Sequence, residues 1–166
     1  MASAKYGCLH PDPKTKEYPV AASQYFQHEG CNAVILDGSG NLTGALTTDQ
    51  KLFGWAIIPK GRGNSTNTSD DYWLSSATAA ADRVPVILAA DGYEFIAPGI
   101  ITCTVAMIGA AWDMIGVNSA STHYVDLDTS TNDVFIVTDL GVNVKEGAAT
   151  TDCVVIFNPN EIQGSA

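Results

Sequence analysis

Charged residues are scarce in this sequence. Only 16% of its 166 residues are Asp, Glu, Lys or Arg, whereas soluble domains average about 25%. Basic residues are the scarcest, since eight Lys and Arg stand against 18 Asp and Glu, which gives a net charge of −10. A protein that neutralises nucleic-acid phosphates needs the opposite balance, so we exclude nucleic acid as a partner. So few charges also suggest that a protein partner covers part of the surface.

Long apolar runs and repeats are absent as well. No apolar run approaches the roughly 18 residues of a membrane-spanning helix, so we expect no membrane partner. The chain has no heptads or internal repeats, which argues against a fibre. Residues 1–5 lack the apolar segment of an export signal, so we expect folding in a reducing compartment.

The four cysteines form no metal or disulfide motif. Cys8, Cys31, Cys103 and Cys153 include no C-x-x-C pair, and no His stands at zinc-finger spacing. Cys103 and Cys153 lie in strand-like sequence, where a free Cys packs as a small apolar residue. We therefore predict four free thiols and no metal or cofactor.

Catalytic motifs are equally sparse. The sequence has no G-x-S-x-G, and its histidines at 10, 28 and 123 lie far apart along the chain. Lys60-Gly-Arg62-Gly lacks the Lys-Ser/Thr that ends a phosphate-binding loop, and we predict a mobile loop there. The functional alternative is a contact in which its two cations meet carboxylates of a neighbouring protein. The expectation is that the protein is not an enzyme.

Residues 126–133 resemble a calcium loop in part. Asp126, Asp128 and Asp133 supply oxygen ligands, but Thr131 stands where such a loop has Gly, and Val137 where it has Glu. We predict that these acids hold a turn through their own backbone amides, with calcium binding as the alternative.

What the sequence does contain is a succession of short strand-like runs separated by Gly, Asp, Asn and Pro. An Asp-Gly-Ser-Gly-Asn turn follows the first run, at 37–41, and one or two helical turns are expected near 74–83. The pattern predicts an all-β fold, an antiparallel β-barrel or sandwich of about nine short strands, over residues 32–166. The expected strands are 33–36, 52–58, 84–88, 93–97, 100–106, 112–117, 123–127, 134–138 and 153–157.

Residues 1–31 differ from the rest in composition. Pro11, Pro13 and Pro19 disfavour both helix and sheet, so we predict an extended N-terminal arm that adds little to the core. Residues 1–62 have a net charge of +1, with six basic and five acidic residues, whereas residues 63–166 have −11. We therefore expect contact with a partner through the arm and the neighbouring basic loop, at Lys5, Tyr6, Leu9, Lys14, Lys16, Tyr18, Lys60 and Arg62.

Four segments in the later part of the chain resemble tailed-bacteriophage head decoration proteins, also called capsid-stabilising or cement proteins. They are Arg-Val-Pro-Val-Ile-Leu-Ala-Ala-Asp-Gly-Tyr-Glu-Phe at 83–95, Val-Ala-Met-Ile-Gly-Ala-Ala-Trp-Asp-Met-Ile-Gly at 105–116, Ser-Thr-His-Tyr-Val-Asp-Leu-Asp-Thr-Ser at 121–130 and Val-Val-Ile-Phe-Asn-Pro-Asn-Glu at 154–161. The resemblance covers about the last 80 residues and lies in the order of these short segments.

This resemblance implies a mostly β protein on the outside of an icosahedral capsid. Its partners would be the major capsid protein and further copies of itself, with a trimer favoured over a dimer. It would be made in the host cytoplasm and located on the virion.

Two other functions remain open from the sequence. One is another virion component, in the tail, neck or head fibre. The other is a carbohydrate-binding β-sandwich in which Tyr72 and Trp73 form an exposed stacking platform. Trp55, by contrast, is expected in the core because it lies within Phe-Gly-Trp-Ala-Ile.

Overall fold

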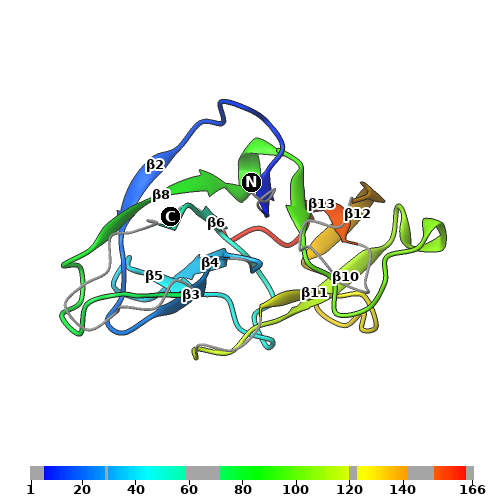
Figure 1. The fold of residues 1–166 in the computed structure, drawn as a ribbon. Helices are drawn as coiled ribbons and strands as arrows, with labels where there is room; N and C mark the ends of the chain where they lie inside the picture. The colour runs from blue at the N-terminus through cyan, green and yellow to red at the C-terminus, as the bar shows by residue number, and fades with distance from the viewer. Residues whose placement is uncertain (1–5, 29, 59–71, 120–122, 142–151, 164–166) are drawn as a thin grey trace.

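The structure, a computed structural model, describes residues 6–28, 30–58, 72–119, 123–141 and 152–163 (Figure 1). These residues form short β-strands and two single-turn 3-10 helices, so the predicted all-β fold is confirmed. Within the described ranges, no helix has the length and apolarity that crossing a bilayer requires. The strands are β1 (Gly7–Cys8), β2 (Lys16–Pro19), β3 (Tyr25–Gln27), β4 (Ala33–Leu36), β5 (Leu42–Gly44), β6 (Gly54–Ala56), β7 (Tyr72–Leu74), β8 (Arg83–Leu88), β9 (Phe95–Ala97), β10 (Ala111–Ile115), β11 (Tyr124–Asp126), β12 (Phe135–Leu140) and β13 (Cys153–Phe157), and the 3-10 helices are η1 (Ala89–Asp91) and η2 (Val105–Met107).

Two antiparallel sheets contain most of the strands. The five-stranded sheet has the order β2-β8-β6-β4-β5 and occupies the left of Figure 1, and the six-stranded sheet has the order β1-β9-β13-β12-β10-β11. β3 and β7 form a separate two-stranded sheet. None of the three sheets closes into a barrel. Of the two predicted architectures, the sandwich-like one therefore fits.

The larger hydrophobic core joins the two main sheets. Trp55 of β6 stacks on Phe95 of β9, with 4.9 Å between ring centroids and 12° between ring planes. Phe95 in turn meets Phe157 of β13 edge-on at 5.4 Å, and Phe157 lies 5.1 Å from Phe135 of β12. Trp55 is only 3% exposed, so its predicted place in the core is confirmed.

The predicted turn at 37–41 is also confirmed. The Oδ1 atom of Asp37 accepts the backbone amides of Ser39 at 2.8 Å and Asn41 at 2.9 Å. Gly40 has a φ of +78°, a conformation that glycine adopts without steric cost. The turn connects β4 to β5, which pair with Leu36 opposite Leu42.

The described residues of the predicted N-terminal arm are part of the folded domain. β1 pairs with β9, β2 pairs with β8, and β3 pairs with β7. Val20 and Phe26 are buried in a second core beneath the five-stranded sheet. The prolines are compatible with this pairing because Pro19 ends an edge strand, where a missing N–H breaks no ladder bond. The expectation that this segment adds little to the core is therefore wrong for residues 6–28.

The predicted helical turns near 74–83 are absent. This segment contains the end of β7, a turn and the start of β8, and Ala80 has a φ of +64°. The Ala80 amide donates to the carbonyl of Val20 at 2.9 Å, and the Ser76 amide donates to the Asp82 carboxylate at 2.7 Å. Because these two amides are bonded to Val20 and Asp82, they are not available for the backbone hydrogen bonds of a helix.

Candidate protein-binding surfaces

Two of the predicted contact residues support the fold instead. The hydroxyl of Tyr6 donates to Oδ1 of Asp152 at 3.0 Å, and its ring packs against the larger core. Tyr18 meets Phe53 edge-on at 5.0 Å, and Nζ of Lys16 lies 5.7 Å from the Tyr18 ring centroid. Neither tyrosine is a free anchor, since both are half-buried within the domain.

The other predicted contact residues of the N-terminal segment are exposed. Leu9 is 47% exposed, and Lys14 and Lys16 are also exposed. We call residues 9–15, which connect β1 to β2, the strap; it arches across the top of Figure 1. Its backbone is tied to the β8–β9 connection, because the Leu9 amide donates to the Glu94 carbonyl and the Lys14 amide to the Tyr93 hydroxyl. Lys5, Lys60 and Arg62 lie outside the described residues.

One edge strand of each main sheet, β2 and β11, is guarded against pairing with another chain. At β2, the side chain of Arg83 donates to the Glu17 carbonyl at 3.3 Å, and Pro19 has no N–H to offer. At β11, the Val125 amide donates to the Pro98 carbonyl at 2.8 Å, and the Val125 carbonyl accepts the Ile100 amide at 3.0 Å. At these two edges, protein contacts through side chains therefore fit better than strand addition.

A loop of the six-stranded sheet exposes large apolar side chains. Ile100 is 37% exposed, Ile101 38%, Val105 71% and Ile108 40%. We call these four side chains the apolar cap. The sequence has no charged residue between Glu94 and Asp113, so the whole loop is uncharged. Sequence reasoning predicted a strand at 100–106. The long uncharged stretch was the signal, missed there, of an exposed apolar loop.

Hydrogen bonds to neighbouring strands hold the cap loop in place. The Gly109 amide donates to the Val137 carbonyl of β12 at 2.8 Å, and the Val137 amide donates back to the Ala110 carbonyl at 3.2 Å. Within the loop, the Met107 amide donates to the Thr104 carbonyl at 3.0 Å, and the indole of Trp112 donates to the Met107 carbonyl at 3.4 Å. The cap is thus a preformed surface.

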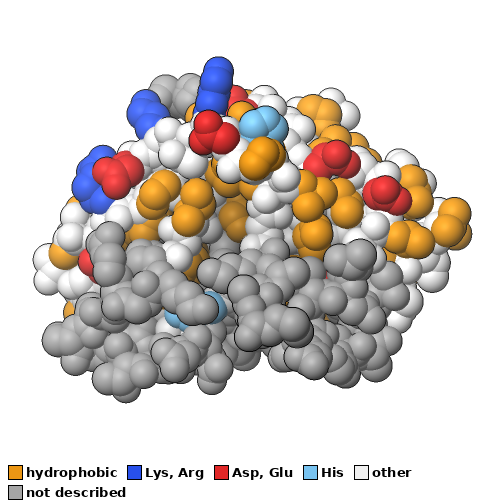
Figure 2. All heavy atoms as spheres, turned by 45° about the horizontal axis from the view of Figure 1, so that its top comes forward, with side chains coloured by type: hydrophobic (Ala, Val, Ile, Leu, Met, Phe, Trp, Pro, Cys, Tyr) orange, Lys and Arg blue, Asp and Glu red, His pale blue; other side chains and the backbone are white. Residues whose placement is uncertain are grey.

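The charges next to the cap are acidic. Asp139 is two positions beyond Val137 in β12, and the Val137 carbonyl accepts the Gly109 amide of the cap loop. Burial raises the pKa of the Cys103 thiol in that loop, and the Asp139 charge adds to the shift. Glu94 precedes β9, and its carboxylate accepts the Thr138 hydroxyl at 2.6 Å. The right half of Figure 2 shows Asp and Glu side chains beside apolar ones, and no Lys or Arg among the described residues there. The described Lys and Arg residues instead lie on the strap, on the five-stranded sheet and just before β6, at Lys14, Lys16, Arg83 and Lys51.

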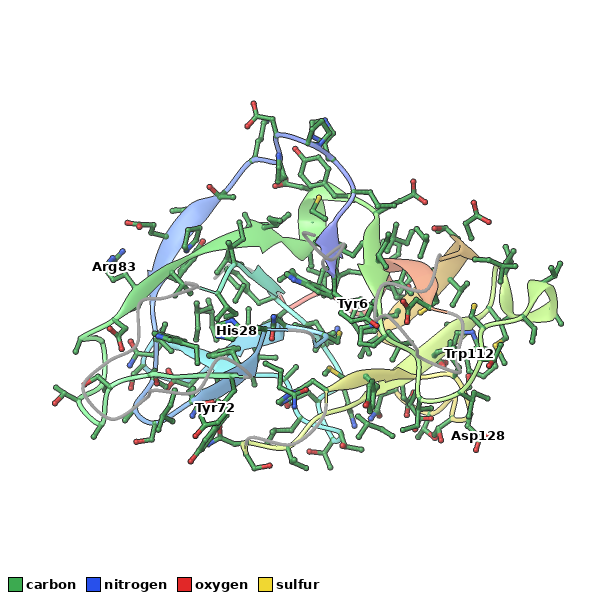
Figure 3. All side chains as sticks on the ribbon, in the orientation of Figure 1. Tyr6, His28, Tyr72, Arg83, Trp112 and Asp128 are labelled. Atoms are coloured by element: carbon green, nitrogen blue, oxygen red, sulfur yellow. The ribbon has the colours of Figure 1, made fainter. Side chains whose placement is uncertain are left out.

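The calcium-like segment forms a turn. Asp126 accepts the Asp128 amide through Oδ1 at 3.1 Å, and Oδ1 of Asp133 accepts the Ser130 hydroxyl at 2.5 Å. Among the described residues, no group of three or more His, Cys, Asp and Glu side chains is placed to hold a metal ion. The exposed Asp128 is labelled at the lower right of Figure 3.

Sequence reasoning missed the acid that organises this turn. Oδ1 of Asp113, a buried residue of β10, accepts the consecutive amides of Thr131 at 2.8 Å, Asn132 at 2.6 Å and Asp133 at 2.8 Å. Asp113 is 18 positions away from the nearest of them, so no local motif announces it.

Asp113→Ala is expected to destabilise the protein by about 3 kcal/mol, because hydrogen bonds to a charged group contribute about 1.5–3 kcal/mol each and water recovers part of that loss. Asp113→Asn keeps an Oδ1 acceptor and is expected to cost less. Urea denaturation measures both. Equal losses would show that the side-chain oxygen does not stabilise the turn.

The proposed carbohydrate platform is not formed. Trp73 is only 2% exposed and packs on Phe26, with 6.0 Å between ring centroids. Tyr72 is half-buried beside Tyr25 at 5.4 Å. A buried indole is inaccessible to a sugar ring, so Trp73 cannot provide the stacking surface that the carbohydrate-binding alternative requires.

All four cysteines are free thiols in the structure. Cys31, Cys103 and Cys153 are buried in the larger core, and burial raises the pKa of Cys31 to about 12. Cys8 is half-exposed, although burial raises the pKa of its thiol as well.

We expect a thiol reagent to modify Cys8 first in the folded protein, because reaction requires an accessible thiolate and the other three thiols are buried. In denaturant without reductant, the reagent is expected to count four thiols. Rapid modification of all four in the folded state would contradict the buried core. A count of two or zero in denaturant would show that disulfides form.

No protein-family model, curated protein or solved structure matches the chain.

Proposed function

We propose that this protein is a virion structural protein that decorates the outer surface of an icosahedral capsid and stabilises it by binding the major capsid protein. The observation that carries the proposal is the apolar cap, in which four large apolar side chains face water from one uncharged, hydrogen-bonded loop. Apolar surface of this kind, depleted of charge at its centre, is typical of protein–protein contacts.

The resembling segments and the cap occur in the same part of the molecule. Residues 105–116 contain η2 and β10, residues 121–130 contain β11, and residues 154–161 contain most of β13. All of these belong to the six-stranded sheet or to the cap loop, and residues 83–95 connect that sheet to the five-stranded one through β8 and η1. The likeness to decoration proteins thus maps onto the half of the molecule that contains the apolar cap.

The proposal also includes contacts between copies. The strap, where Leu9, Lys14 and Lys16 are exposed, is a second candidate docking surface. As the resemblance implies, we propose a homo-oligomer, with a trimer favoured over a dimer, on the capsid exterior.

Binding to undecorated capsids tests this function. The purified protein is expected to co-sediment with capsids that lack it and to raise the temperature at which they disassemble, since a ligand that binds only the assembled shell stabilises it. Capsids already decorated with the protein serve as the control and are expected to take up no more. If the protein stays in the supernatant with undecorated capsids, the proposed function is wrong.

A further inference from the structure

The cap loop differs from ordinary exposed apolar residues. Single apolar side chains are common on protein surfaces and need no explanation. Here four of them fall within nine residues of one loop, at 100–108, and Val105 is 71% exposed. Leu140, 37% exposed, adds a further apolar side chain at the end of β12, the strand to which the loop is bonded through Val137. Such a cluster suits a contact with another protein.

The hydrogen bonds of the cap loop lower the entropy cost of binding a partner through it. Bonds from Gly109 and Ala110 to β12, and from Ile100 to β11, hold both ends of the loop. A loop that is already ordered loses little conformational entropy when a partner binds, so more of the contact energy appears as affinity.

The neighbouring charges restrict which partner fits. Asp139 lies in β12, two positions beyond the Val137 carbonyl that accepts the Gly109 amide of the cap loop, and Glu94 bonds Thr138 of the same strand. The described cations lie elsewhere. A face-to-face contact between two caps would bring these carboxylates of both copies together, which is unfavourable. Positively charged side chains on a different protein would complement them. Charge complementarity therefore favours a cationic partner over a second copy.

We propose that the apolar cap is the docking surface of this protein, and that it binds a capsid subunit through an apolar patch flanked by lysine or arginine side chains. This inference rests on the proposed function and adds the surface and the chemistry of the partner. Sequence reasoning placed docking at the strap, so the two surfaces make opposite predictions for matched variants.

Two matched substitutions test whether the cap or the strap binds the capsid. Val105→Asp and Leu9→Asp each place one carboxylate at an exposed apolar position. Val105→Asp is expected to weaken binding to undecorated capsids at least about 30-fold, the range of a hot-spot residue. Leu9→Asp is expected to change it less than about threefold. Ile108→Asp repeats the test at a second cap position, and circular dichroism and thermal melting check that each variant folds like the wild type.

Salt dependence tests the charge of the partner. Binding of the wild type is expected to weaken as ionic strength rises, because salt screens exposed charges. Asp139→Asn is expected to weaken binding at low salt and to reduce the salt dependence; Asn keeps the side-chain oxygen that accepts the Leu140 amide. Binding that does not change with salt or with Asp139→Asn would overturn the cationic partner.

The possible outcomes distinguish the inference from the function on which it rests. If the wild type binds capsids and Val105→Asp binds equally well, the cap is not the docking surface, whereas the proposed function stands. If Val105→Asp changes only the oligomeric state, measured by light scattering, the cap contacts a second copy and the inference is wrong. If the wild type itself does not bind, the proposed function fails and the inference fails with it.

Discussion

A chain that begins at Val20 is expected to be destabilised by at least about 4 kcal/mol, a large part of the 5–15 kcal/mol typical of a folded domain. Truncation removes β1 and β2, and so exposes the edges of β9 and β8. It also removes the half-buried Tyr18 from Phe53 and the half-buried Tyr6 from the larger core, and each loses part of the about 1.5–3 kcal/mol that full burial of a large apolar side chain contributes. Differential scanning calorimetry measures the loss.

Lys14→Ala is the control for this truncation. Only the backbone amide of Lys14 bonds to Tyr93, so the substitution leaves both strands in place and is expected to change stability by less than about 0.5 kcal/mol. A truncated chain that melts like the wild type would show that residues 6–19 are the free arm that their proline content predicts.

Trp55→Ala is expected to cost about 3–5 kcal/mol, the usual loss for truncating a buried aromatic side chain. Trp55 is the residue of the five-stranded sheet that stacks on Phe95 of the six-stranded sheet, and the rings of Phe95 and Phe157 continue the contact. Losing it leaves a cavity between the two sheets. Urea denaturation monitored by circular dichroism measures the change.

Trp112→Ala provides a matched control with the same change in side-chain size. Trp112 of β10 is half-buried at the edge of the larger core, and its indole bonds the Met107 carbonyl, so a smaller loss, about 1 kcal/mol, is expected. Equal losses for Trp55→Ala and Trp112→Ala would contradict the role of Trp55 in joining the sheets.

Much of the fold could be predicted from local sequence signals. The Asp37–Asn41 turn and the strands at Ala33–Leu36 and Cys153–Phe157 are specified by residues next to one another in the chain. The pairing of β2 with β8 could not be predicted in this way, because their partners are more than 60 positions apart and prolines weaken the local strand signal. Likewise, the turn at 131–133 depends on the distant Asp113.

The candidate site shows where composition misleads. Ile100 to Ala106 has the β-branched content of a buried strand, yet Val105 is the most exposed large apolar residue described. Composition reports that a segment is apolar, but it does not report whether the apolar surface faces the protein's own core or a partner. Departures from local rules are expected at functional sites, and the cap is such a departure.

A three-dimensional reconstruction of capsids with and without the bound protein tests the central claim most directly. We predict added density on the outer surface of the capsid, oriented so that Val105 and Ile108 meet the capsid subunits, with lysine or arginine side chains of those subunits close to Asp139. Absence of added density, or density in which the cap faces solvent, would contradict the account.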